Sequence, residues 1–296
     1  MPVELSIPTP KGFDFLTTVR GHGWYDLAPF RFDEAKAELR YTFTDASGCK
    51  VAAGSINGLP GELTVRLTSR SVPVAKVVRD VRHILRLDDD MAEFYDAARR
   101  EDRLHWAADI GAGRLLRSPT VFEDAVKTMC TTNCSWALTR KMVENLVEKL
   151  GISAAGGTKA WPTPAAMASV DEAFYREEIR AGYRSPYFVE FAEAVASGEI
   201  DPESWLHSDL PTSELRKEIK SVKGFGDYAA DNLLKLLGRY DGLALDSWLR
   251  AKFYEKHSSG KKCPDKRIAK HYAKFGKWQG LAIWCDMTEY WHVEGR

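Results

Sequence analysis

The hydrophobic period of the chain changes once, after about its first quarter, and this change limits the possible fold more than any other feature. Up to residue 70, apolar and polar residues alternate, as in ELRYTFT (38–44) and ELTVRLTSR (62–70), which is typical of strands with one buried face. From SVPVAKVVRDVRHILRL (71–87) onward, the apolar spacing is that of helices. Strands followed by a run of helices predict an α+β protein that begins with an antiparallel β layer.

The composition is that of an ordinary globular chain. Its 296 residues, 44% of them apolar, are enough for two or three domains, each with its own core. No apolar run approaches the ~18 to 20 residues that a membrane span needs. The first residues, MPVELSIPTPKGF, lack the basic and then apolar order of a signal peptide. We therefore expect an intracellular protein, in the cytoplasm, nucleoid or nucleus, that is not secreted and has no membrane partner.

The five cysteines are scattered along the chain and contain no C-x-x-C pair or repeated metal-ligand spacing. They are Cys49, Cys130, Cys134, Cys263 and Cys285. Cys130 and Cys134 could lie on one helix face, but no histidine or further cysteine is close enough in the sequence to complete a metal site with them. The sequence therefore predicts reduced thiols, no metal site and no cofactor.

The charge of the chain is balanced as a whole but unevenly distributed. The formal net charge is zero, which by itself argues against a general nucleic-acid binder. Residues 212–296, however, contain 17 Lys and Arg against 11 Asp and Glu, and most of the excess lies in AKFYEKHSSGKKCPDKRIAKHYAKFGK (251–277). Such a run is either a solvated face or a surface that meets phosphates, and charge alone leaves both open.

Two helices and a tight turn stand out in the helical part. The pair Ser118-Pro119 predicts the start of one helix, and another runs from Ser135 to a stop at Gly151. Further on, ELRKEIKSV (214–222) and DYAADNLLKLLG (227–238) form a helical hairpin around KGFG. Glycines spaced G-x-G predict positive φ and exposed N–H groups at the start of the second helix, a nest that binds phosphate. A tight helix corner has the same pattern, so the turn alone does not decide its role.

One helix and one loop later, LALDSWLR places Asp246 on a short segment, and here the sequence resembles the helix-hairpin-helix (HhH-GPD) DNA glycosylase superfamily. The likeness is strongest to its 8-oxoguanine and 3-methyladenine glycosylase II branch, through VRGHGWYDL, GAGRLLRSPTVFEDAVKTMCTTNCS, AGYRSPYF and FGKWQGLAIWCDM. It implies a β domain at 1–80, a helical domain with gap-filling loops at 81–211, and a helix-hairpin-helix and C-terminal helical region at 212–296. The active cleft would lie between the two helical domains.

The resemblance also implies the partner, which is double-stranded DNA containing a damaged base, bound by a monomer. At the hairpin, Gly224 and Gly226 would hold a DNA phosphate. Lys223 stands where the family usually has proline, and it would add a cation beside that phosphate.

Three further positions match residues that the family places in the opened duplex. Asn133 would enter the space left by the flipped nucleotide, Tyr183 would wedge beside the lesion, and Arg184 would contact the orphaned base. Taken singly, Asn133 could be a helix cap and Tyr183 an ordinary packing residue. Their order along the chain, together with the hairpin, favours the functional interpretation.

The chemistry of N-glycosidic cleavage assigns a role to Asp246. The bond breaks through an oxocarbenium-like sugar, which a fixed carboxylate stabilises, and the carboxylate can also orient the attacking water. A base inside a duplex must be extruded before it can be reached, and aromatic residues then stack on it. The resemblance places Trp248, Trp284 and Asn232 in the base pocket.

The residue that limits the reaction is Tyr228. Bifunctional members of the branch have a lysine at this position, and its amine forms a Schiff base that leads to strand cleavage. A phenol cannot form an imine, and with a pKa near ~10 it is neutral at pH 7. The sequence therefore predicts hydrolysis to an abasic site without lyase activity. Lys223 lies on the turn and Lys235 two helical turns further, so neither replaces the missing lysine.

The lesion is less narrowly defined. Two polar residues that read oxidised guanine in the family appear here as Leu138 and Gly280, and the stacking phenylalanine appears as Trp284. A larger π face suits cationic bases, so alkylated purines are expected first and oxidised guanine next. The iron-sulphur branch is excluded because its closely spaced cysteines are absent. Two alternatives stay open: a bifunctional enzyme that uses another lysine, and an inactive protein that binds damaged DNA.

Overall fold

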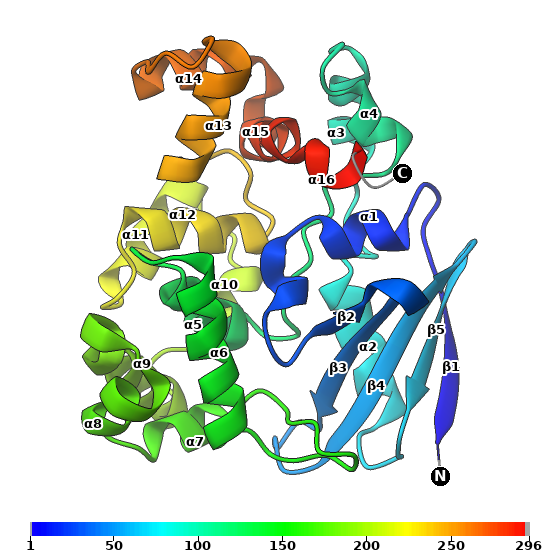
Figure 1. Cartoon of the computed structure of the whole chain (residues 1–296), viewed down its shortest axis with the longest axis vertical. Helices are drawn as coiled ribbons and strands as arrows, with labels where there is room; N and C mark the ends of the chain where they lie inside the picture. The colour runs from blue at the N-terminus through cyan, green and yellow to red at the C-terminus, as the bar shows by residue number, and fades with distance from the viewer. Residues whose placement is uncertain (1, 294–296) are drawn as a thin grey trace.

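The computed structural model describes residues 2–293 and begins with one antiparallel sheet (Figure 1). Its strands are β1 (Val3–Pro8), β2 (Arg31–Asp33), β3 (Glu38–Thr44), β4 (Val51–Leu59) and β5 (Glu62–Leu67). They lie in the order β1-β5-β4-β3-β2. Leu39 on β3 and Val65 on β5 both pair with Ile56 on β4, and all three are buried on one face of the sheet. The expected antiparallel β layer is confirmed.

The rest of the described chain is mainly helical. The elements next to the sheet in sequence are α1 (Phe15–Arg20), η1 (Gly23–Asp26), η2 (Glu34–Lys36), α2 (Val74–Ile84), α3 (Ala92–Arg99) and α4 (His105–Asp109). The central ones are α5 (Val121–Cys130), α6 (Trp136–Leu150), α7 (Pro164–Ala168), α8 (Glu172–Phe174), η3 (Tyr175–Ile179), η4 (Gly182–Arg184), α9 (Ser185–Ser197) and α10 (Glu203–Leu206). The last are α11 (Thr212–Ser221), α12 (Asp227–Leu236), α13 (Ser247–His257), α14 (Asp265–Tyr272), η5 (Ala273–Trp278), α15 (Gln279–Thr288) and α16 (Tyr290–Val293). The α+β class, with a helical hairpin formed by α11 and α12, is confirmed.

Capping residues set the limits of the two central helices. As expected, α6 begins after Ser135 and ends before Gly151. The prediction for α5 was two residues early, because its N-cap is Thr120, whose hydroxyl accepts a hydrogen bond from the first turn at 3.2 Å. The Ser118 N–H donates to the Asp124 carboxylate at 2.8 Å instead, so this serine belongs to the preceding loop.

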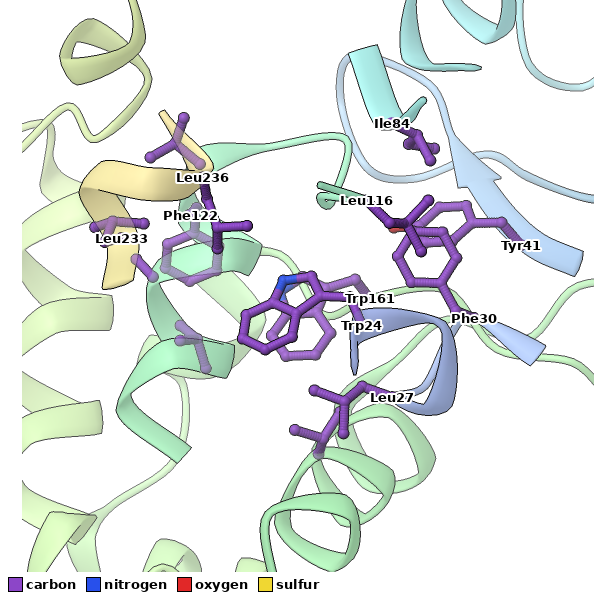
Figure 2. Close-up of a cluster of buried hydrophobic side chains, with 14 of the residues drawn as sticks. Trp24, Leu27, Phe30, Tyr41, Ile84, Leu116, Phe122, Trp161, Leu233 and Leu236 are labelled. Carbon is purple, nitrogen blue, oxygen red and sulfur yellow. The ribbon is translucent and has the colours of Figure 1, made fainter. Parts of the chain in front are cut away.

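The buried apolar residues form two clusters that do not follow chain order. Figure 2 shows part of the larger one, in which Trp24 lies between Tyr41 of β3 on one side and Phe122 of α5 with Leu233 of α12 on the other. In the smaller one, residues 91–115, which contain α3 and α4, pack with residues 240–287 of the C-terminal helices. The hairpin helices thus share the core of the central helices, while α3 and α4 share that of the C-terminal region. The expected boundaries after residues 80 and 211 do not coincide with this division of the cores.

A buried arginine joins the hairpin to the rest of the molecule. Arg86 follows α2, and its guanidinium donates to the carbonyls of Lys235 and Leu236 at the end of α12. The same group donates to Leu115 O at 2.7 Å and to Asp89 at 2.7 Å. A cation suits the negative end of the helix dipole, so Arg86 fixes the position of α12. Within residues 2–293, no helix is both long and apolar enough to cross a membrane.

Candidate functional site

A cavity of about 740 Å³ lies where η1, the C-terminal end of α5 and the first turn of α6 meet helices α12, α13 and α15. Of the nine tryptophans in the chain, five line it: Trp24, Trp136, Trp248, Trp284 and Trp291. We call it the tryptophan cavity. The rings of Trp24 and Trp136 stack with centroids 6.5 Å apart, and Trp284 lies 6.1 Å from Trp248 and 5.7 Å from Trp291. Flat rings on several sides make this a site for a planar aromatic ligand.

Hydrogen bonds hold three of these rings in place. The indole N–H of Trp24 donates to Asp124 at 2.7 Å, that of Trp136 to Asp26 at 2.8 Å, and that of Trp284 to Gly21 O at 2.9 Å. These three hydrogen bonds fix the cavity walls before any ligand binds. Burial also raises the pKa of the Asp124 carboxyl to about 6.

His22 packs between two of the walls, with its ring centroid 4.3 Å from Trp24 and 5.4 Å from Trp284. Burial, followed by the charge of Lys235, lowers the pKa of His22 to about 3. The imidazole is therefore neutral at physiological pH and contributes a ring rather than a charge.

Every residue predicted for catalysis and for the base pocket lines this cavity. Tyr228 and Asn232 are four residues apart on α12, and the Asn232 amide donates to Tyr228 O at 2.8 Å. Burial raises the pKa of the Tyr228 phenol, so it is neutral at pH 7. Asp246 is the N-cap of α13, and Trp248 and Trp284 complete the set.

The Asp246 carboxylate is fixed through one of its oxygens. Oδ1 accepts the Leu249 N–H at 2.6 Å, while Oδ2 makes no hydrogen bond to any residue in 2–293. The first turn of α13 directs the positive end of a helix dipole toward this N-cap side chain. The carboxylate is thus oriented at the cavity with one oxygen available.

The hairpin turn differs in one respect from its prediction. Gly224 has the expected positive φ of 95°, but Gly226 has φ −77° and ψ −174°, an extended conformation that any residue can adopt. Gly226 is the N-cap of α12, so its N–H and those that follow are still presented at the helix start. Lys223 is exposed beside the turn, with its amine 2.8 Å from the Glu190 carboxylate.

This difference predicts unequal effects for two similar substitutions. A Cβ on Gly224 would lie 2.9 Å from Met129 Sδ and 3.0 Å from Tyr187 Cβ, in a backbone conformation that alanine resists. We expect Gly224→Ala to lower the free energy of unfolding by ~1–3 kcal/mol and to weaken binding of duplex DNA. A Cβ on Gly226 meets nothing within 4 Å, so Gly226→Ala should cost less than ~1 kcal/mol. Urea unfolding and DNA titration compare the two, and equal effects would contradict the assignment of the turn.

Asn133 and Tyr183 meet at an exposed corner that follows α5. Asn133 has a left-handed φ of 46°, which suits asparagine, and its amide donates to the Tyr183 hydroxyl at 3.2 Å. Tyr183 is 49% exposed. Because Thr131 lines the tryptophan cavity and Asn133 is only two residues further, this corner stands at the rim of the cavity.

Arg184 is placed differently from its neighbour. It is buried, and its Nε donates to Met129 O at 3.2 Å and to Thr132 Oγ1 at 3.0 Å. The guanidinium lies 4.5 Å from the centre of the Tyr183 ring. In this conformation Arg184 supports Tyr183 from inside the protein, and its contact with an orphaned base stays a prediction.

No family model and no curated protein matches this sequence, but solved structures match it over nearly its whole length. MBOgg1 in complex with a low-affinity DNA ligand has 20% identity and a TM-score of 0.77, covering 99% of this chain and 96% of that one. The 3-methyladenine DNA glycosylase from Archaeoglobus fulgidus has 18% identity and a TM-score of 0.77, covering 98% and 99%. The apo 8-oxoguanine glycosylase/lyase from Clostridium acetobutylicum has 19% identity and a TM-score of 0.74, covering 96% and 95%. The chain has the fold of the helix-hairpin-helix DNA glycosylases.

The two residues aligned with the polar base readers of the family, Leu138 and Gly280, do not line the cavity. Leu138 lies on the outer surface of α6 and is 38% exposed. Gly280 packs against the loop after α12, where an added Cβ would lie 2.0 Å from Gly242 O. A glycine is needed there for close packing, so its identity says nothing about the lesion.

The glycosylase fold also brings in residues that the sequence analysis missed. Trp24, Trp136, Trp291 and His22 line the cavity. Lys235 was noted only as an amine too far along the helix to replace the lyase lysine, and its contact with the Trp284 ring was not foreseen. The segment VRGHGWYDL, which contains His22 and Trp24, carried part of the family likeness and was the available signal. Nothing local distinguishes Trp136 or Trp291 from a tryptophan of the core.

Away from the cavity, His257, His271 and Asp286 bring possible metal-ligand atoms within 4.8 Å of one another. The Asp286 carboxylate accepts a hydrogen bond from the Tyr272 hydroxyl at 2.5 Å, and its Oδ2 lies 2.7 Å from His257 Nε2. Its Oδ1 forms an ion pair with the Lys256 amine at 2.8 Å. These contacts lower the pKa of Asp286 to about 2 against the effect of burial, His257 contributing most among them. A lysine therefore supplies the positive charge for this carboxylate, and the cluster holds the C-terminal helices together.

Proposed function

We propose that this protein is a monofunctional DNA glycosylase of base-excision repair. It would extrude a damaged purine from duplex DNA, hydrolyse the N-glycosidic bond and leave an abasic site. The observation that carries the proposal is the juxtaposition of a fixed carboxylate, Asp246, with a cavity of aromatic rings that has Tyr228 at the position of the lyase amine.

Asp246 supplies the charge for the reaction. As the base departs, positive charge develops on the sugar, and a carboxylate already oriented by Leu249 N needs no reorganisation to stabilise it. Its free oxygen can also accept a proton from, and so orient, the water that attacks the anomeric carbon. Tyr228 lines the cavity as a neutral phenol and forms no covalent bond with the sugar in this scheme.

The other predicted residues serve recognition. The N–H groups at the start of α12 would bind a phosphate beside Gly224, and Asn133 with Tyr183 would fill the gap in the duplex. The tryptophan rings would stack on the extruded base. On the size of the Trp284 face we place alkylated purines first and oxidised guanine next.

One observation favours a second candidate, a glycosylase with lyase activity. Lys235 has a buried amine on the same side of α12 as Tyr228, and burial lowers the pKa of this amine to about 8. A desolvated amine is a good nucleophile. Lys235 does not line the cavity, however, which supports hydrolysis as the reaction.

A panel of duplexes, each with one damaged base, distinguishes these functions. We expect the wild-type protein to release at least one modified purine, and to leave a strand that breaks only after treatment with alkali. A covalent adduct trapped by borohydride, or breaks without alkali, would establish the lyase instead. Tight binding of damaged duplexes without release of any base would identify a protein that only binds DNA.

A further inference from the structure

Lys235 is a buried cation that the proposed reaction does not use. It is 3% exposed, and its Nζ has no hydrogen-bond partner in the part of the chain that the structure describes. The amine lies over the ring of Trp284, 4.7 Å from the centroid. Burying a charge without a partner lowers the free energy of unfolding. We therefore looked for a function of this amine at the adjacent cavity.

The position on α12 explains how the amine reaches this place. Lys235 is seven residues after Tyr228 and three after Asn232, so all three lie on one face of the helix. Helical side chains lean toward the N-terminus, which directs the amine back along the cavity wall. Trp284 lines the cavity and Lys235 does not, and the buried amine lies over the Trp284 ring. We infer that a base stacked on this indole would have the ring between itself and the amine.

The charges around the amine are few. Burial lowers the pKa of Lys235 to about 8, with Asp246 and Asp231 acting in the opposite direction, so the amine is still mainly protonated at pH 7. His22 faces it as a neutral ring. The Arg86 guanidinium donates a hydrogen bond to the backbone carbonyl of Lys235.

The remaining charges at the cavity are paired and solvated. Arg20 forms an ion pair with Glu34, and Asp26 lies 3.4 Å from Arg140 Nε. All four side chains are between 28% and 59% exposed. The inner end of the cavity therefore has one carboxylate, Asp246, and one cation, Lys235. Without the lysine this end would be net negative, which would attract a positively charged base.

We propose that Lys235 is a specificity-determining residue that makes the cavity select neutral damaged purines over purines with a permanent positive charge. This inference rests on the proposed glycosylase function. An indole attracts a cation over either face of its ring, and the ammonium of Lys235 already lies over one face of Trp284. A cationic base stacked on the same indole would face the ammonium across the ring and be repelled by it. This divides the alkylated purines that the size of the Trp284 face placed first. Neutral adducts such as 1,N6-ethenoadenine are accepted with oxidised guanine, while 3-methyladenine is disfavoured, because the repulsion by Lys235 outweighs the attraction of the indole for its positive charge.

The test compares release of a cationic base with release of a neutral one. Single-turnover rates are measured for 3-methyladenine from methylated DNA and for 1,N6-ethenoadenine from a defined duplex. Lys235→Met keeps the length of the side chain and removes its charge, and we expect it to raise the ratio of cationic to neutral release at least about tenfold. Lys235→Arg keeps the charge and should keep the wild-type ratio.

The variants should fold, because replacing an unpaired buried charge by an apolar chain removes a desolvation cost. Lys235→Gln provides a second neutral side chain, and thermal unfolding of all three checks the fold. A ratio that stays within twofold of wild type in both neutral variants would overturn the inference. If the wild-type protein releases no base from the whole lesion panel, the proposed function fails separately. If it releases neither of these two bases, the affinities of the variants for the two DNAs still test the charge selection.

Discussion

Asp246→Asn is expected to slow base release by a factor of ~10²–10⁴ while leaving the protein folded. Asparagine is as good an N-cap as aspartate, so the hydrogen bond from Leu249 N, now 2.6 Å long, is retained. What is lost is the negative charge beside the sugar, and with it the stabilisation of the oxocarbenium-like transition state. Single-turnover release from the best substrate of the lesion panel measures the effect, and thermal unfolding measures the fold.

The capping role of Asp246 makes the choice of control important. Asp246→Ala removes both the charge and the cap, and should cost ~1 kcal/mol of stability in addition to activity. A variant at an N-cap away from the cavity, Thr163→Ala, loses a comparable cap at the start of α7 and should keep most of the activity. Release by Asp246→Asn at the wild-type rate would show that this carboxylate is only a cap.

The residues that sequence reasoning found share a local signal. Tyr228 and Asn232 follow the hairpin turn on one helix face, and Asp246 follows one loop later, so motif and spacing were enough to place them together. The α+β class likewise follows from the change in hydrophobic period. In each case the deciding information lies within about twenty residues of sequence.

The features that sequence reasoning missed depend on distant contacts. The Trp24 ring is held by Asp124, a hundred positions away, and Trp284 by Gly21, 263 positions away. No local pattern encodes such pairs. The same holds for Lys235: helical periodicity places it on the cavity side of α12, but only the position of Trp284 shows that its amine is buried.

The basic run at 251–277 shows how structure separates two interpretations that charge alone left open. Lys252, Lys256, Lys274 and Lys277 form ion pairs with acidic side chains, two of which, Glu93 and Glu101, come from α3 and the turn after it. Lys274 and Lys277 thereby join the two segments of the smaller core, while the pairs of Lys252 and Lys256 lie within the C-terminal segment. Surface pairs of this kind contribute little energy each, but they specify the contact. The part of the run that still suits a phosphate-facing surface is therefore shorter than its sequence suggests.

Tyr228→Lys is expected to create a covalent activity that the wild-type protein lacks. The new amine would stand on the cavity face of α12, near Asp246 and within an aromatic wall where burial lowers the pKa of an amine, as it does for Lys235. A neutral amine can attack C1′ of an abasic sugar in its aldehyde form and lose water to give an imine. Borohydride reduces that imine to a stable amine, so the variant should form a cross-link with abasic duplex DNA, seen as a band of lower mobility in a denaturing gel.

Because Lys235 already has an amine next to the cavity, the experiment needs controls that show which lysine forms the cross-link. The Lys235 amine is buried over the Trp284 ring and Lys235 does not line the cavity, so wild type and Tyr228→Gln should give no cross-link. Tyr228→Lys should give one whether or not Lys235 is also changed to Met. A cross-link in wild type that disappears in Lys235→Met would mean that the buried amine moves into the cavity and acts as the nucleophile. A cross-link that appears only with a lysine at position 228 would show that this cavity is arranged for imine formation, and that the tyrosine is what limits the protein to hydrolysis.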